Sequence, residues 1–177
     1  MVFVSCSKDS PNDSTDSNNF YSKQIGIYTF ISKPFNAEKL IKLNYKESFE
    51  KLSAETKDSI IKEYNNYMCF LFEIKIDGFT GDIVEYDEPK KESDYNKKLS
   101  YYLFEMQKDF SLKDSKGLET PCTIYYFERL SEIAKTNKFI VGFNKVNSDG
   151  ITFEYNNQII NCGNIKFNIR SNQLALN

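Results

Sequence analysis

The sequence predicts a mainly β fold, β-sandwich-like and antiparallel, with one or two helices. Three observations support this prediction. Apolar and polar residues alternate with a period of two in several short segments, turn residues separate these segments at roughly ten-residue spacing, and 15 Phe and 12 Tyr supply bulky core side chains. The pattern is typical of an antiparallel sandwich or barrel, and we expect two packed sheets with a helix covering one end. An α+β fold is the alternative.

A single folded domain is expected. The chain has 177 residues, of which 40% are hydrophobic, and this is enough for one sizeable core but short for two. We place the domain at residues 20–177. No apolar run inside it approaches the length of a membrane span.

The first predicted strand covers residues 25–31, where apolar side chains occupy both faces, and Pro34 ends the segment. Residues 39–45 fit either a short strand or the start of a helix, and the strand is favoured. The clearest helix covers residues 54–64, because Ser53 is a good N-cap.

The middle of the domain changes to a period of two. Residues 70–76 alternate as a strand with one face inward. Residues 83–86 are expected to form a short return strand, and residues 87–98 a polar loop. A further strand is predicted at residues 99–106, with a helix as the alternative.

The last third is the most regular part of the chain. Strands are predicted at residues 120–130 and 138–146. The sequence NSDG at residues 147–150 has turn chemistry and is expected to join the second strand to residues 151–155 as a hairpin. Residues 164–170 alternate and predict the last strand.

Histidine is absent from the sequence. This absence excludes an imidazole general base, Ser-His-Asp and Cys-His nucleophile pairs, and metal sites with imidazole ligands. Chemistry based on carboxylates, lysine, tyrosine or thiols remains, as does the binding of hard cations by oxygen ligands.

Charges are nearly balanced, with 23 Lys and Arg against 25 Asp and Glu interleaved along the chain. Nucleic-acid-binding proteins usually carry a basic face, so we expect no nucleic-acid partner. Glu92 and Asp94 interrupt the most basic run, which we interpret as a solvated surface segment. This run consists of Lys90, Lys91, Lys97 and Lys98.

At the amino terminus, Phe3, Val4 and Ser5 precede Cys6. Two apolar residues and a small residue before a cysteine resemble the lipobox of bacterial lipoproteins, although Phe3 stands where Leu is usual. In that family the signal peptide is cut immediately before the cysteine, whose thiol is acylated. The resemblance implies that residues 1–5 are the remnant of a signal peptide and that Cys6 is the lipidation site.

A polar segment follows this cysteine. Residues 7–19 are mostly Ser, Lys, Asp, Pro, Asn and Thr, a composition that does not offset the entropy cost of ordering. As a flexible chain they would reach about 20 Å. We interpret residues 6–19 as the lipidated cysteine and a flexible tether, and the alternative is a disordered end with a chance cysteine.

Two further features resemble export signals. Ser7 directly after the cysteine resembles the arrangement for transfer to the outer membrane, and the sequence SKDS resembles the signal of surface lipoproteins of Bacteroidota. The resemblance implies a protein anchored to the outer membrane by lipid, facing the periplasm or the exterior. Its partners would then be the membrane and an envelope protein or glycan.

Three cysteines lie in the folded domain, at Cys69, Cys122 and Cys162. No Cys-x-x-Cys spacing occurs, so the sequence gives little support for a zinc or redox site. In an oxidising compartment Cys122 and Cys162 are the most plausible disulfide pair. The alternative, which we favour, is that all three are small buried apolar residues.

Acidic residues gather in two turns, where they could serve as calcium ligands or as a general acid and base. Neither turn has the spacing of a calcium loop, so exposed acidic turns are the simpler interpretation. The residues are Asp77 and Asp82 in the first turn, and Glu85, Asp87 and Glu88 in the second. We predict no catalytic residue, metal ligand or cofactor.

Two aromatic clusters offer a candidate binding surface. On an outer face their rings could stack on sugars or anchor a protein partner, whereas on an inner face they would fill the core, which is the interpretation we favour. The clusters are Tyr101, Tyr102 and Phe104, and Tyr125, Tyr126 and Phe127.

These observations predict a non-catalytic, membrane-anchored lipoprotein whose β domain binds an envelope partner, protein or glycan. One alternative is a carboxylate-dependent enzyme acting on polysaccharide, and another is a lipoprotein that neutralises a toxin. A cleft with two facing carboxylates would favour the enzyme, and a flat aromatic patch would favour the binding protein.

Overall fold

A computed structural model describes residues 14–16, 20–87, 91–129, 134–160 and 162–170. Nine antiparallel strands form one sheet in the order β1-β2-β3-β4-β7-β6-β5-β8-β9. This confirms the mainly β, antiparallel prediction. The strands are β1 (Ser14–Asp16), β2 (Phe20–Ile25), β3 (Tyr28–Phe35), β4 (Tyr67–Ile76), β5 (Phe110–Asp114), β6 (Glu119–Glu128), β7 (Asn137–Asn144), β8 (Gly150–Asn156) and β9 (Asn164–Arg170).

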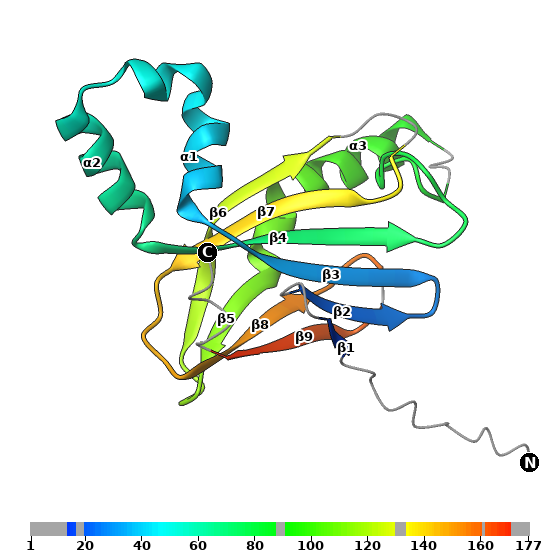
Figure 1. Cartoon of the computed structure of the whole chain (residues 1–177). Coiled ribbons are helices and arrows are strands. Elements are labelled where there is room, and N and C mark those ends of the chain that lie inside the picture. The colour runs from blue at the N-terminus through cyan, green and yellow to red at the C-terminus, as the bar shows by residue number, and fades with distance from the viewer. Residues whose placement is uncertain (1–13, 17–19, 88–90, 130–133, 161, 171–177) are drawn as a thin grey trace, which may run out of the picture.

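One continuous, curled sheet replaces the two packed sheets that we expected (Figure 1). The strand β6 joins its two halves, because the first residues of β6 pair with β5 and the later ones pair with β7. A register shift between Cys122 and Ile124 lies where the partner changes, and such bulges bend a strand. The curling brings the ring of Tyr21 in β2 to 6.3 Å from that of Phe167 in β9.

Aromatic side chains fill the interior of the curled sheet. Phe72 in β4 is fully buried, and its ring centroid lies 5.1–6.3 Å from those of five other rings. Burying one such side chain contributes about 1.5–3 kcal/mol. The five neighbouring rings belong to Phe30, Phe110, Phe139, Phe153 and Tyr155.

A helical arm connects β3 to β4 and projects away from the sheet (Figure 1). It consists of α1 (Ala37–Tyr45), the 3₁₀ turn η1 (Lys46–Lys51) and α2 (Ala54–Tyr64). The helix predicted at residues 54–64 is confirmed, and Ser53 accepts a hydrogen bond from the Thr56 backbone N–H as its N-cap.

The strand favoured for residues 39–45 is wrong, because this segment is part of α1. Asn36 caps the helix by accepting a hydrogen bond from the backbone N–H of Lys39 at 2.9 Å. Leu40 and Ile41 are the buried residues of the helix. The N-cap at Asn36 was the signal that the sequence-based prediction passed over.

Residues 92–109 also differ from prediction. The expected polar loop at residues 87–98 and strand at residues 99–106 are replaced in large part by α3 (Glu92–Ser100), the π-helical turn η2 (Tyr101–Glu105) and the 3₁₀ turn η3 (Met106–Asp109). Leu99, Tyr102 and Met106 have the i, i+3, i+7 spacing of a helix face, and the last two are buried in the core. The apolar pattern of residues 99–106 is too short to distinguish the period of a strand from that of a helix.

The first predicted strand, at residues 25–31, spans a hairpin instead. Gly26 has φ of +58° and turns the chain between β2 and β3, a conformation that glycine adopts without steric cost. The strand β3 then continues through Pro34, whose pairing partner is Phe70 in β4. Among the described residues the pairing of β3 with β2 ends at Ser32, so Pro34 sits where a missing N–H is tolerated.

Two more connections were predicted incorrectly. Residues 83–86 form a hydrogen-bonded turn instead of a strand, with the Glu85 N–H donating to the Asp82 carbonyl at 2.9 Å. Residues 147–150 link β7 to β8, but these strands are not a hairpin, since β8 pairs with β5 and β9. The strands predicted near 70–76, 120–130, 138–146, 151–155 and 164–170 are confirmed as β4, β6, β7, β8 and β9.

The amino-terminal segment is described only in part. Residues 14–16 form β1 and pair with β2, so this part of the predicted tether at 6–19 is a strand. Cys6 and residues 1–5 lie outside the described residues. Within the part of the chain that the structure describes, no helix is long and apolar enough to cross a membrane.

Candidate binding pocket

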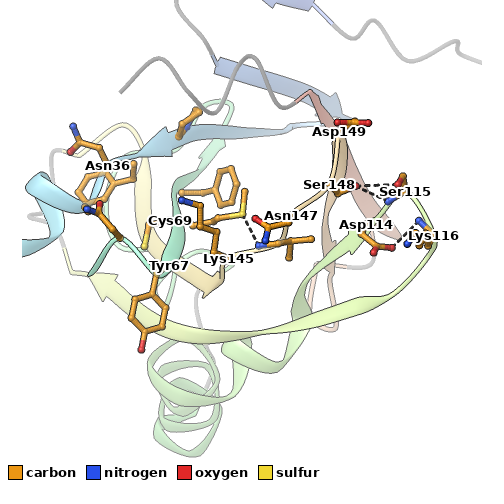
Figure 2. Close-up of a pocket in the computed structure, with 17 residues that line it drawn as sticks. Asn36, Tyr67, Cys69, Asp114, Ser115, Lys116, Lys145, Asn147, Ser148 and Asp149 are labelled. Atoms are coloured by element: carbon orange, nitrogen blue, oxygen red, sulfur yellow. Dashed lines mark hydrogen bonds between the residues drawn. The ribbon is translucent and has the colours of Figure 1, made fainter. Parts of the chain in front are cut away.

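A pocket of about 790 Å³ opens at one end of the curled sheet (Figure 2). At this end β3 and β7 finish and β4 and β8 begin, so residues far apart in the sequence meet there. The lining residues are Pro34, Phe35, Asn36, Ala37, Asn65, Tyr67, Met68, Cys69, Phe70, Asp114, Ser115, Lys116, Lys145, Val146, Asn147, Ser148 and Asp149.

Apolar residues on the inner face of the sheet form the floor of the pocket. Pro34 and Phe70 are paired residues of β3 and β4, and Met68 precedes Phe70 on the same face. The Sδ atom of Met68 accepts a hydrogen bond from the backbone N–H of Val146 at 3.3 Å. The backbone N–H of Lys145 donates to the Asn66 carbonyl at 2.8 Å, so the loop after β7 is fastened to the start of β4.

Polar side chains of two connections form the rim. Ser148, in the loop between β7 and β8, has its Oγ 3.1 Å from the Ser115 Oγ and accepts from the Ser115 N–H at 3.3 Å. Asp114 accepts from the backbone N–H groups of Lys116 and Leu118, each at 2.8 Å. The Asp114 carboxylate is therefore engaged in holding the β5–β6 turn.

Other rim side chains are available to a ligand. Among the described residues, none donates to, accepts from or pairs with the side chains of Asn65, Asn147 and Asp149. Two acidic residues, Asp114 and Asp149, balance two lysines in the pocket lining. Figure 2 labels Lys145 and Asn147 among the residues that line the pocket. The pocket therefore offers amide and carboxylate groups without a net charge.

The two aromatic clusters considered from the sequence lie outside the pocket. Among the six residues of the two aromatic clusters, Tyr102 and Phe127 are buried, and Tyr101 and Tyr125 are half-buried against the core. Only Phe104, at 66%, and Tyr126, at 54%, count as exposed. The core interpretation thus holds for most of the six, and they do not form an outward patch of three or more rings.

The three cysteines of the domain are free thiols in the structure, and the disulfide considered between Cys122 and Cys162 is not formed. Cys69 and Cys122 are buried, and Cys162 is half-buried. Burial raises the pKa of the Cys69 thiol to about 11 and that of Cys122 to about 12. These two thiols are therefore protonated at neutral pH, which makes them poor nucleophiles.

Asp82, one of the acidic turn residues, has a structural role. It is buried, and its carboxylate accepts from the Arg129 Nε at 2.8 Å and from the Val84 N–H at 3.0 Å. Arg129 also donates to the Tyr95 hydroxyl at 3.2 Å. The network ties residues 82–84 to the segment after β6 and to α3.

The remaining acidic turn residues are not brought together into a site. Asp77 is half exposed and pairs with Lys75 at 3.5 Å. Glu85 and Asp87 lie in the turn that follows Asp82, and Glu88 is outside the described residues. No group of three or more Asp, Glu or Cys side chains within the described ranges is arranged to hold a metal ion.

Two polar clusters were missed by the sequence reasoning. Tyr101 donates to Asp109, and its hydroxyl lies 3.5 Å from that of the buried Tyr155. Burial raises the pKa of the Asp109 carboxyl above its ordinary value, although the Tyr101 hydrogen bond acts in the opposite direction. Tyr101 and Asp109 are eight residues apart across the π-helical turn, so no simple sequence spacing indicates the contact.

The second cluster surrounds Glu154 in β8. Its buried carboxylate accepts from Lys113 and Lys166, both at 3.0 Å, and from Asn164 at 3.1 Å. Burial by itself would raise the pKa of Glu154, but the hydrogen bonds from these three donors outweigh it and lower the pKa. The register of β5, β8 and β9 brings the partners together, and the register was unknown from sequence.

Comparisons with known proteins give one structural similarity. No protein-family model and no curated protein matches the chain. The crystal structure of a DUF4426 family protein from Pseudomonas aeruginosa PAO1 is similar to it with a TM-score of 0.42 and 12% sequence identity. The similarity covers 88% of this chain and 96% of that one.

Proposed function

We propose that this protein is a lipoprotein of the outer membrane that is anchored through Cys6 and whose β domain binds an envelope partner, protein or glycan, without catalysing a reaction. The observation that supports binding best is the pocket at the end of the sheet, where polar side chains surround an apolar floor and three of them have no partner in the described part of the chain. An apolar floor with polar groups that can orient a ligand is a feature of ligand sites. The anchor is supported by the lipobox-like sequence before Cys6.

The carboxylates of the pocket favour binding over catalysis. Glycoside cleavage needs two carboxyl groups aimed at one reacting bond. The pocket has two, but Asp114 is engaged by the backbone of its own turn, and Asp149 lies on the adjoining loop. One carboxylate without a second free group supplies contact with a ligand more readily than general acid and base chemistry.

Intact-mass analysis of the protein extracted from membranes of its host tests the anchor. We expect a chain that starts at Cys6 and carries the added mass of a diacylglyceryl group, and we expect this mass to be lost in Cys6→Ser. An unmodified soluble chain that retains Met1 would overturn the membrane anchor.

Binding is tested separately with the full chain carrying Cys6→Ser, which removes the lipid. We expect this protein to sediment with outer-membrane fragments from a host strain that lacks it. Unlabelled protein should compete for the same sites. A protein that stays in the supernatant at every concentration would overturn the proposal that the domain binds an envelope partner.

A further inference from the structure

We infer that the anchored protein faces the membrane with the end of its sheet that lies opposite the pocket, so that the pocket and the helical arm point away from the lipid. The inference rests on the proposed anchor at Cys6 and goes beyond it by assigning the surface nearest the lipid headgroups. It is supported by the direction of β1, the length of chain between Cys6 and β1, and the composition and position of the arm.

The direction of β1 shows from which side the chain enters the sheet. Asp16 pairs with Phe20 and Ser14 pairs with Ser22, so the chain traced back from Asp16 to Ser14 runs towards the turn at Gly26. That turn joins β2 to β3, and it lies at the other end of β3 from the pocket. The strand therefore points the preceding chain, and the anchor at its start, away from the pocket.

The chain between the anchor and β1 is short. Residues 7–13 separate Cys6 from Ser14, and a chain of this length spans about 15 Å on average when flexible and at most about 29 Å. Because Ser22 pairs with Ile31, Ser14 lies about 10 Å along the sheet from the Tyr28 end of β3 and about 13 Å from its Phe35 end. Reaching the first end needs no change of direction, whereas reaching the pocket requires a reversal and most of the average span.

The end opposite the pocket has a compact surface made of two turns. The Asp77 N–H donates to the Ile27 carbonyl at 2.9 Å, and Tyr28 pairs with Ile76 beside it. These contacts hold the turn after β2 against the turn after β4. Ile27 is exposed at the tip, and an apolar side chain in this position can enter the headgroup layer.

The helical arm is unsuited to contact with lipid. Its residues 37–64 contain six lysines and six acidic residues, and one exposed pair joins Lys42 to Glu38 at 2.9 Å. Helices that lie in a membrane interface have a broad apolar face and a basic polar face, whereas the exposed large apolar residues of the arm are Leu43 and Ile61. Figure 1 shows the arm and β1 at opposite sides of the sheet, so an anchor before β1 leaves the arm in water.

The test couples the full chain to vesicles through the Cys6 thiol, using a maleimide lipid in phosphatidylethanolamine and phosphatidylglycerol. The background carries Cys162→Ser, because Cys162 is half-buried, whereas Cys69 and Cys122 are buried and should not react. The sequence contains no Trp. A single introduced Trp therefore reports its distance from dansyl-labelled headgroups by energy transfer.

Three variants place the Trp at exposed apolar positions. Ile27→Trp lies at the turn after β2, Leu118→Trp lies in the β5–β6 turn beside the pocket, and Leu43→Trp lies on the arm. The ten residues of β4 set the two ends of the sheet about 30 Å apart, so we expect transfer at Ile27→Trp to be at least about twofold stronger than at the other two sites.

A relocated anchor is the control. In a chain that carries Cys6→Ser and Lys116→Cys, the lipid is attached to an exposed position of the β5–β6 turn. Transfer should then be strongest at Leu118→Trp. This reversal would show that the order of the three sites reports the point of attachment.

Two results with the Cys6 anchor would overturn the inference: equal transfer at the three sites, or stronger transfer at Leu118→Trp or Leu43→Trp. Because the lipid is attached chemically, neither result depends on acylation in the host. Intact-mass analysis that finds no acyl group would overturn the proposed anchor and the inference with it. An acylated protein with equal transfer at the three sites would keep the anchor and lose the orientation alone.

Discussion

The two ends of the curled sheet differ in how their polar groups are used. At the end formed by the last residues of β4 and the first of β7, Asp82 pairs with Arg129, and Asn137 bonds the turn after β4. At the other end, Asn147 and Asp149 have no partner among the described residues. We call these the closed end and the open end. Asp82 and Asn137 at the closed end are buried and hydrogen-bonded, whereas Asn147 and Asp149 at the open end are exposed to solvent.

The closed end is not fully satisfied. Asn157 accepts from the backbone N–H groups of Ile159 and Ile160, but its Nδ2 has no partner among the described residues. The same is true of the Ser32 Oγ in the interior. Among the buried side-chain nitrogen and oxygen atoms of the described residues, these two lack a hydrogen-bond partner, and folded proteins tolerate a few such atoms.

The largest effect is expected in the interior shared by both ends. Phe72→Ala removes a fully buried ring that contacts five others. We expect the free energy of unfolding in urea to fall by about 3–5 kcal/mol. Phe104→Ala, at a ring that is 66% exposed, is the matched control and should change it by less than about 0.5 kcal/mol. Equal effects at both positions would contradict the described core.

A smaller loss of stability is expected at the closed end, and it can be compared with the loss at the open end. Asn137→Ala removes the acceptor of the Ile83 N–H at 2.9 Å and the donor to the Gly81 carbonyl at 3.2 Å. Leaving such buried groups unpaired costs about 1–3 kcal/mol, and amide hydrogen exchange at Ile83 should accelerate. Asn147→Ala at the open end should cost less than about 0.5 kcal/mol. The comparison fails if Asn147→Ala is the more destabilising change.

Acidification tests the cluster around Glu154 on the sheet wall. The pKa of Glu154 is lowered in the folded state, so the unfolded state binds more protons as the pH falls through the ordinary glutamate range, near about 4.3. Its stabilising contribution is therefore present above that range and is lost as the pH falls towards the lowered pKa.

Urea unfolding between neutral and acidic pH measures this contribution. Glu154→Gln should lose less stability on acidification than the unchanged protein does. Glu85→Gln, at an exposed carboxylate in the turn after β4, should follow the unchanged protein. Parallel curves for the unchanged protein and Glu154→Gln would show that the three donors do not stabilise the charged carboxylate.

The smallest effect concerns the cysteine thiols, which should react little with alkylating agents in the folded protein. With Cys6→Ser in place, we expect Cys69 and Cys122 to resist alkylation at neutral pH, because burial raises the pKa values of their thiols to about 11 and about 12. Mass analysis after alkylation in denaturant without reductant should recover all three thiols. Recovery of Cys69 as the single free thiol would establish the bridge between Cys122 and Cys162.

Local patterns were enough to predict the strands in which alternation extends over seven residues. Those near residues 70–76 and 164–170 were predicted because apolar and polar side chains alternate along them, as they do where one face of a strand is buried. The strand near residues 138–146 is buried on both faces. The helix at residues 54–64 was predicted for a similar local reason, since Ser53 caps its own helix. These features depend on residues that are close together in the sequence, so they can be predicted from the sequence.

The pairing of strands and the position of the pocket depend on contacts between residues that are far apart in the sequence. The NSDG turn is local, but whether β8 pairs with β7 or with β5 depends on which partner buries its inner face, and β5 lies far away in the sequence. The pocket is lined by residues at the ends of β3, β5 and β7, at the start of β4 and in the adjoining loops. The order of the strands in the sheet brings these segments together. A turn depends on a few neighbouring residues, whereas the order of strands depends on packing between distant segments. Local sequence patterns therefore could not predict where the pocket forms.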